Sequence, residues 1–307
     1  MLHRRAVFIC AALIAGVGTA STAWAADPAR CRELARKYDV SKPQITAVEV
    51  SLTLFGAMDK NCVELATALL DDGASFDARD RLGSKPLSHA ASAGHLEMVD
   101  LLLARGAEIN ARNLAGATAL YKAAERGQEA VLRRLIERGA DVNLGGRSGV
   151  SPVAAAAYAG RASIVRLLLA HGADGQIADE TGKPPIVYAA ASGQLDIVKQ
   201  LLALNIDINA RYANDLTILM WASGPDERVA EPQALEVVVY LIDAGAHIDD
   251  RDARGRTALM IAAEGGHADI AKALLAHGAD PTLKDKSGNR AADLTVLSEL
   301  RETLMPR

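Results

Sequence analysis

Residues 116–143, GATALYKAAERGQEAVLRRLIERGADVN, carry the signals for two short helices and two turns. Thr118 can cap a helix, because its hydroxyl accepts a hydrogen bond from a free N–H of the first turn. A glycine then separates Ala119–Arg126 from Glu129–Arg138, and in the second segment the apolar residues recur at helical spacing. Gly139 suits the left-handed conformation that ends many helices. The stretch therefore predicts a helix–turn–helix unit followed by a polar, hairpin-like turn.

This unit recurs along the chain with a period of 33 residues. The turn glycines that keep the period are Gly83, Gly116, Gly149 and Gly182, and then Gly255 and Gly288. A second column of Gly-Ala pairs keeps the same register and begins at Gly73, Gly106, Gly139, Gly172, Gly245 and Gly278. A fixed period of this length is typical of stacked repeats, in which each unit packs only on its neighbours. The sequence therefore predicts an all-α solenoid.

Where a unit lacks a glycine, the replacement obeys the same backbone requirement. Asn205 stands at the end of a second helix, and Asp215 stands in a turn. Asn and Asp are the residues other than glycine that best tolerate a positive φ. We therefore expect both residues to adopt the left-handed conformation.

These motifs resemble ankyrin repeats. The likeness is plainest in GSKPLSHAASAGHLEMVDLLLARGAEINARN from Gly83 and in GRTALMIAAEGGHADIAKALLAHGADPTLKD from Gly255. It implies seven units, which we number 1 to 7: 47–79, 80–112, 113–145, 146–178, 179–211, 212–251 and 252–284. An N-terminal segment, 26–46, would precede them, and a capping element, 285–307, would follow.

The chain departs from the family at one position of each unit. The family often has His after the Thr-Pro-Leu triplet, and this slot holds Ser88, Tyr121, Ala154, Val187, Met220 and Met260. Apolar packing is expected to replace the usual histidine network between repeats.

The first 25 residues have the composition of a cleavable secretory signal. Arg4 and Arg5 precede an apolar run, Ala6–Val17, and an Ala-Trp-Ala site ends at Ala25. The run is shorter than the ~20 residues that span a bilayer. We expect cleavage before Ala26, export to the periplasm and no membrane insertion of the mature chain.

Cysteine content and charge agree with this expectation. Cys31 and Cys62 remain after cleavage, and an even pair in an oxidising compartment predicts a disulfide, with two buried free thiols as the alternative. The mature chain has 32 basic and 38 acidic residues, a net charge of −6. This balance argues against nucleic acid as a partner.

A search for chemistry finds no catalytic, cofactor or metal site. The sequence contains no H-E-x-x-H or C-x-x-C motif. The glycines near Lys183 have the wrong spacing for a phosphate loop. Asp179 and Glu180 are interpreted as a solvated tip, and His95 and His267 as structural residues of the repeat. We therefore expect a protein that is not an enzyme.

The residue that ends each unit is basic in five of seven cases: Arg79, Arg112, Arg211, Arg251 and Lys284, with Gly145 and Ala178 as the exceptions. Arg81, Arg147, Arg254 and Lys286 lie at neighbouring tips. These cations either are common, solvated residues of the ankyrin pattern or form an edge that meets an acidic protein surface.

In the ankyrin family, hairpin tips and first helices form the usual binding surface. Carried over, the resemblance implicates Arg79, Arg112, Tyr212, Arg251 and Arg254 at the tips, and Tyr188 and Trp221 on first helices. Tyr188 and Trp221 occupy equivalent slots of successive units, where they either bind a partner or pack adjacent helices.

Unit 6 contains seven additional residues within SGPDERVAEP, residues 223–232. Insertions in repeats fall in loops, often on a binding face, although a neutral bulge is the alternative. Pro232 is expected to restart the second helix.

The leading hypothesis is a monomeric, periplasmic protein that binds another protein, either a stress-defence enzyme such as a catalase or a toxin that it neutralises. The alternative is a secreted effector that acts on host proteins. The identity of the partner is left open.

Overall fold

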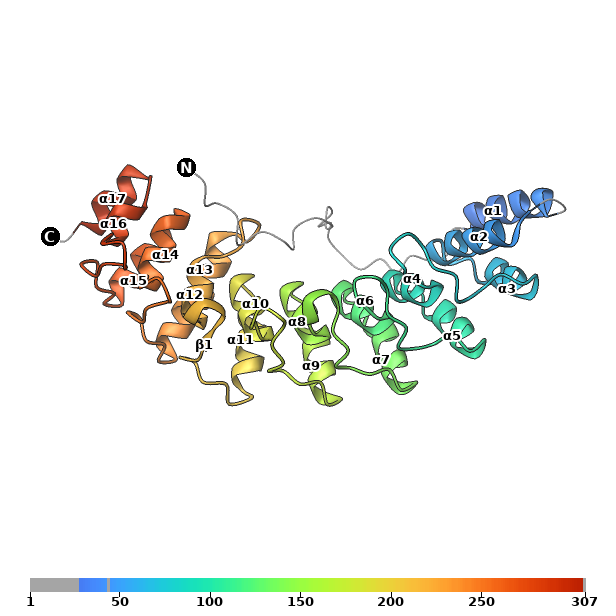
Figure 1. Cartoon of the computed structure of the whole chain (residues 1–307), viewed down its shortest axis with the longest axis horizontal. Coiled ribbons are helices and arrows are strands. Elements are labelled where there is room, and N and C mark those ends of the chain that lie inside the picture. The colour runs from blue at the N-terminus through green and yellow to red at the C-terminus, as the bar shows by residue number, and fades with distance from the viewer. Residues whose placement is uncertain (1–27, 43–44, 306–307) are drawn as a thin grey trace.

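The computed structural model describes residues 28–42 and 45–305, which form a curved row of helical pairs (Figure 1). The expected signal segment and its cleavage site lie outside the described residues. The all-α prediction is confirmed: within the described part, the only strands are β1 (Arg211–Tyr212) and β2 (Leu216–Thr217), which pair antiparallel.

Each unit supplies one pair of helices, and the end segments supply three more. The N-terminal helix is α1 (Pro28–Ser41), and the closing helices are α16 (Ala291–Leu294) and α17 (Ser298–Leu304). The pairs are α2 (Ala47–Asp59) and α3 (Val63–Asp71), α4 (Pro86–Ala93) and α5 (Leu96–Ala104), α6 (Ala119–Arg126) and α7 (Glu129–Glu137), α8 (Pro152–Tyr158) and α9 (Ala162–Ala170), α10 (Pro185–Ala191) and α11 (Leu195–Leu202), α12 (Ile218–Ser223) and α13 (Glu231–Asp243), and α14 (Ala258–Gly265) and α15 (Ala268–Ala276).

The local signals act as the sequence predicts. Thr118 Oγ1 accepts a hydrogen bond from the backbone N–H of Tyr121 at 3.1 Å, and Thr257 caps α14 in the same way. Asn205 and Asp215 adopt positive φ angles of 59° and 61°. In the C-terminal cap, α16 ends at Leu294, because the backbone of Thr295 is extended.

Small side chains set the spacing between neighbouring units. First helices α4, α6, α8 and α10 lie side by side on the concave side of the row, and α5, α7, α9 and α11 lie outside them (Figure 1). One column of alanines is fully buried between the first helices: Ala90, Ala123, Ala156, Ala189, Ala222 and Ala262. A larger residue in this column would push adjacent helices apart, because protein interiors are close-packed.

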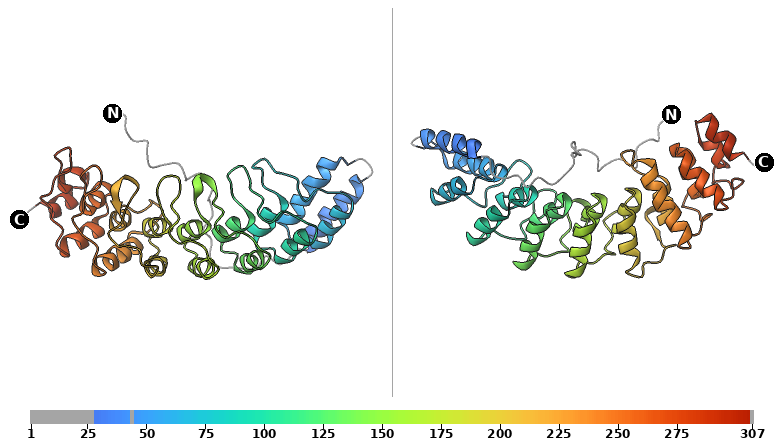
Figure 2. Two further views of the ribbon diagram at one scale, coloured as in Figure 1. Left: turned by 60° about the horizontal axis from the view of Figure 1, so that its bottom comes forward. Right: turned by 180° about the vertical axis from the view of Figure 1, so that it is seen from behind.

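The hairpin turns project from the helical layers in one direction, as the left view of Figure 2 shows. Backbone hydrogen bonds join neighbouring tips: Leu114 N–H to Leu82 O (3.0 Å), Glu180 N–H to Ser148 O (2.9 Å), Ala253 N–H to Asn214 O (3.1 Å) and Lys286 N–H to Arg254 O (2.9 Å). These bonds hold in register the tips of units 2 and 3, those of units 4 and 5, and those from unit 6 through unit 7 to the C-terminal cap.

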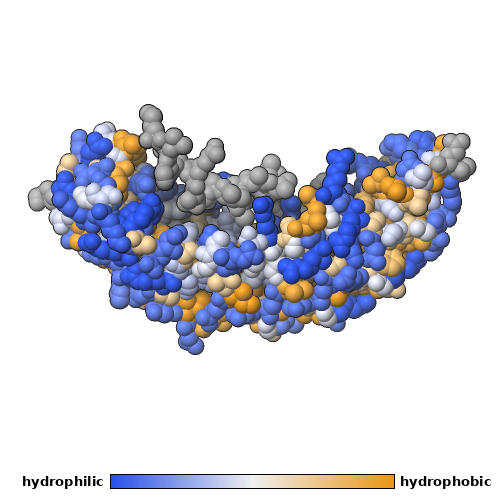
Figure 3. All heavy atoms as spheres, viewed as in Figure 1, coloured by the Kyte–Doolittle hydropathy of each residue, from blue (hydrophilic) through white to orange (hydrophobic). Residues whose placement is uncertain are grey.

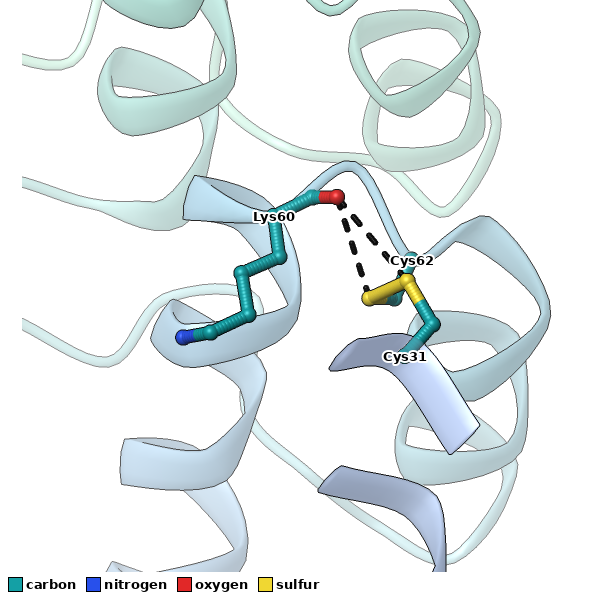
Figure 4. Close-up of a disulfide and its surroundings, with 3 residues drawn as sticks. All are labelled: Cys31, Lys60 and Cys62. Carbon is teal, nitrogen blue, oxygen red and sulfur yellow. Dashed lines mark hydrogen bonds between the residues drawn. A yellow bond between two sulfur atoms is a disulfide. The ribbon is translucent and has the colours of Figure 1, made fainter. Parts of the chain in front are cut away.

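Helix α1 covers the first unit and is attached to it at two places. Cys31 of α1 is joined to Cys62, with an S–S distance of 2.00 Å, and both sulfurs lie near the carbonyl oxygen of Lys60 (Figure 4). The hydroxyl of Tyr38, a buried residue, donates a hydrogen bond to Asp72 at 2.9 Å. The pairing is the one that the sequence predicts, and its formation in the exported protein stays a prediction.

Candidate protein-interaction surface

Four arginines of the predicted basic edge form hydrogen bonds between units. Arg79 donates to the carbonyl of Arg112 at 3.0 Å, and Arg112 donates to that of Gly145 at 2.7 Å. Further along, Arg211 donates to the carbonyl of Arg251, which in turn donates to that of Lys284 at 3.1 Å.

We call these four residues, Arg79, Arg112, Arg211 and Arg251, the arginine ladder. Each member reaches the equivalent position of the next unit, so the ladder has a structural role that neither sequence interpretation anticipated. The side chains are exposed, so their charge still contributes to the surface potential.

The interpretation of Asp179 as a solvated tip is wrong. Its side chain is buried and accepts hydrogen bonds from the backbone N–H groups of Thr181 (2.8 Å) and Lys183 (3.0 Å) and from the hydroxyl of Tyr188. Burial by itself would raise the pKa of Asp179, but these hydrogen bonds outweigh it and lower the pKa. Asp179 thus holds its turn closed as a carboxylate.

The sequence analysis did not identify that a side-chain acceptor for the turn N–H groups recurs at the same position of successive turns. The residue three positions before the turn glycine accepts the turn N–H groups in four units and in the C-terminal cap: Asp80, Asn113, Asp179, Asp252 and, in the cap, Asp285. These positions share the 33-residue register of the glycines, so the same periodicity could have revealed them.

The predicted residues on the first helices come together around one cation. Lys183 Nζ lies 5.8 Å from the ring centre of Tyr188 and 5.5 Å from that of Trp221. Tyr158 of α8 meets Tyr188 edge-to-face at 6.3 Å. The indole N–H of Trp221 is buried, with no hydrogen-bond partner in the described part of the chain. The sequence had identified Tyr188 and Trp221 but not Lys183 or Tyr158.

The remaining predicted tip residues differ in exposure. Arg254 is exposed, and its side chain has no hydrogen bond or ion pair to the residues that the structure describes. Tyr212 belongs to β1, opposite Leu216, and is half-buried; burial raises the pKa of its hydroxyl. Arg254 is therefore available to a partner, whereas Tyr212 is partly used for packing.

The inserted segment of unit 6 is folded against earlier and later units. The N–H of Asp226 donates to Ala191 O of unit 5 at 3.1 Å, and its carboxylate accepts from the hydroxyl of Tyr158 of unit 4 at 3.0 Å. At the other end, Glu231 accepts the backbone N–H of Asp269 of unit 7 at 2.9 Å. We call residues 224–231 the clasp, because they connect units 4 to 7.

A polar contact between units 1 and 2 centres on His89, a residue that the sequence did not single out. Its ring lies 3.2 Å from Asp59 Oδ1 through Nδ1 and 2.9 Å from Asp80 Oδ2 through Nε2, and it meets the ring of Phe55 edge-to-face. Hydrogen bonds to Asp59 and then Asp80 raise the pKa of His89, although burial opposes them.

Two other histidines behave differently. Burial lowers the pKa of His95 and of His267, as suits structural histidines.

The composition and helices of the described residues, 28–42 and 45–305, bear on metal binding and on membrane insertion. These residues contain no group of three or more His, Cys, Asp or Glu side chains that could hold a metal ion. No helix among them has both the length and the apolarity that a membrane span requires.

Comparison with known proteins assigns the chain to a family. Models of ankyrin repeats match residues 54–146, 144–212 and 241–294. The chain therefore belongs to the ankyrin-repeat family, whose members are interaction modules for other proteins. The matches leave out residues 213–240, which include the clasp.

Individual relatives are also ankyrin-repeat proteins, although the curated relatives match only part of this chain. The chain is 39% identical over 83 residues, 27% of its length, to ankyrin repeat domain-containing protein 63 of mouse and of human. It spans only about a fifth of those relatives (20% and 21%). The crystal structure of the human ASB11 ankyrin repeat domain superposes with a TM-score of 0.64 at 27% identity, covering 73% of this chain and all of that one.

Proposed function

We propose that the chain is exported to the periplasm and binds a protein partner there through its hairpin tips and first helices. The leader pattern and the cysteine pair support export, and membership of the ankyrin-repeat family supports a protein as the ligand.

The observation that carries the binding surface is the group of Tyr188, Lys183 and Trp221. Tyr188 and Trp221 lie on the neighbouring first helices α10 and α12, and Lys183, which precedes α10, lies close to both rings. Trp and Tyr are enriched among the residues that dominate binding energies at protein interfaces, because they combine a large apolar area with a polar group. The exposed charge of Arg254 and of the arginine ladder suits a partner with an acidic surface.

The test begins with affinity capture from periplasmic extract on the mature chain, residues 26–307. The captured protein is then purified, and its affinity is measured for the wild type and for Trp221→Ala, Arg254→Glu and Arg166→Glu. We expect the first two variants to bind about tenfold or more weakly. Arg166→Glu should not change the affinity, because Arg166 lies on the outer helix α9.

Charge reversal of the arginine ladder would be a poor test, because it also removes the hydrogen bonds between units. The melting temperature of Trp221→Ala separates the two interpretations of this residue. A lower melting temperature with unchanged affinity would show that Trp221 only packs adjacent helices and would contradict its place in the interface.

A further inference from the structure

Two leucines are exposed at neighbouring hairpin tips. Leu82 of unit 2 is 59% exposed, and Leu114 of unit 3 is 82% exposed. Among the described residues 80–284, they are the only large apolar side chains exposed to this extent. A single exposed leucine needs no explanation, but two together on one edge form a small apolar patch that is open to a partner.

The backbone holds the two leucines in a fixed arrangement. The N–H of Leu114 donates to the carbonyl oxygen of Leu82 at 3.0 Å. The Leu114 side chain also packs closely over Gly83, whose φ of 72° is left-handed; a Cβ there would lie only 2.8 Å from Leu114 Cγ. The apolar pair is therefore built into the tips and loses little freedom when a partner covers it.

Cations flank the pair on both sides. Arg81 and Arg147 occupy in units 2 and 4 the position that Leu114 occupies in unit 3, because the positions are 33 residues apart. Both arginines are exposed, and neither forms an ion pair within the described part of the chain. Arg79 and Arg112 add the charge of the ladder beneath the same tips. Along this edge, a cation at the tip of unit 2 is therefore followed by a leucine at the tip of unit 3 and by a cation at the tip of unit 4.

We propose that Leu82 and Leu114, with Arg81 and Arg147, dock a protein segment in which apolar side chains are flanked by carboxylates. The inference rests on the proposed function and specifies the chemistry of the partner. Leucines would cover the apolar residues, and the arginines would pair with the carboxylates and select against basic segments. An anionic lipid surface would be repelled by the net charge of the chain, −6 after the expected cleavage.

On the face viewed in Figure 3, hydrophilic residues predominate, and apolar residues lie in separate groups among them. A segment with a short apolar core and an acidic border matches such a surface better than a broad apolar partner does.

The experiment uses a phage-displayed library of random dodecapeptides selected on the mature chain. We expect selected peptides to combine Leu, Ile or Phe with Asp or Glu. Their affinity, measured by fluorescence anisotropy, should fall about tenfold or more in the double variant Leu82→Ser/Leu114→Ser and in Arg81→Glu/Arg147→Glu. The matched control is Val296→Ser, which removes another exposed apolar side chain (91% exposed) in the C-terminal cap. The control should leave binding unchanged, and circular dichroism checks that every variant is folded.

Several results would overturn the inference. One is that the selected peptides bind the leucine variant as tightly as they bind the wild type, and another is that they are basic. A selection that recovers no peptide whose binding depends on the leucines would also contradict the inference. Leucine-dependent binding to vesicles of phosphatidylglycerol, without peptide binding, would assign the patch to a lipid surface.

If a captured protein depends on Trp221 and Arg254 but not on the leucines, this inference fails while the proposed function stands. Leucine-dependent peptide binding, together with a captured protein that ignores Trp221 and Arg254, would instead support this inference and contradict the proposed binding surface.

Discussion

Arg112 illustrates what a single residue contributes to this solenoid. Its Nε donates to Gly116 O of the following turn at 2.8 Å, while its Nη2 donates to Gly145 O of the next unit at 2.7 Å. One guanidinium thereby joins two units through two donors whose relative positions are fixed by its planar geometry, whereas the donors of a lysine are carried on a single, freely rotating ammonium group.

We therefore predict that Arg112→Lys lowers the free energy of unfolding by about 1 kcal/mol, the typical net value of such hydrogen bonds. Urea denaturation followed by circular dichroism provides the measurement. Arg254→Lys is the matched control, since the Arg254 side chain has no bond within the described residues, and it should change stability little. Equal effects of the two changes would contradict the structural role of the ladder.

The contact of His89 with Asp59 and Asp80 makes the junction of units 1 and 2 sensitive to pH. The folded state raises the pKa of His89, so the stability that its charge contributes is complete below the unfolded value of about 6.5 and is lost as the pH rises through the folded value. The pKa of Asp59 and of Asp80 is lowered, so their contribution is lost only as the pH falls below about 4.

We predict that His89→Gln destabilises the protein by about 1 kcal/mol more near pH 5.5 than near pH 8.5. Denaturation of both proteins at the two pH values provides the measurement. Taking the difference between variant and wild type cancels the opposing effect of His95, whose buried ring is destabilising when protonated. A loss of stability that is the same at both pH values would show that the contact is not ionic.

At the scale of elements, the clasp connects units that do not follow each other directly. Asp226 lies in unit 6 but bonds to α8 in unit 4 and to the end of α10 in unit 5. Val229 approaches Gly193, where a Cβ would lie 2.9 Å from the Val229 side chain. The clasp therefore links the ends of α8 and α10 to the start of α15.

We predict that Asp226→Ala destabilises the protein by about 1–2 kcal/mol, because Tyr158 and the turn of the clasp lose a charged acceptor. Hydrogen exchange should become faster in α8, α10 and the clasp. The neighbouring change Glu227→Ala is the control, since Glu227 is exposed and has no bond within the described residues. Unchanged exchange in α8 after Asp226→Ala would mean that the clasp does not stabilise unit 4.

At the scale of the whole molecule, stability is distributed along one dimension. Each unit packs on its neighbours, so a local defect is expected to stay local except where the clasp bridges units. The joined Cys31 and Cys62 hold α1 over the first unit, and the closed loop would contribute roughly 3–4 kcal/mol in the chain-entropy model.

We predict that Cys31→Ser/Cys62→Ser increases hydrogen exchange in α1, α2 and α3 and leaves α8 to α15 protected. In the exported wild type, a thiol assay under denaturing, non-reducing conditions should find neither cysteine free. Two free thiols would contradict the disulfide, and loss of protection along the whole chain would contradict the one-dimensional description.

The sequence by itself determined the repeat, its register and its helices, because capping residues, left-handed glycines and apolar periodicity act within a few residues of each other. Ala119–Arg126 begins and ends where it was predicted, and Asn205 and Asp215 take the positive φ expected of them. It also brought Tyr188 and Trp221 together, since a constant period places equivalent residues side by side.

Only the tertiary structure decided what the polar side chains bind. The ladder of arginines, the contact of His89 with Asp59 and the attachment of the clasp all join atoms that lie in different units. Such bonds depend on how far each unit is rotated and shifted relative to the next. That geometry is set by the packing of the buried alanine column and not by any local sequence signal.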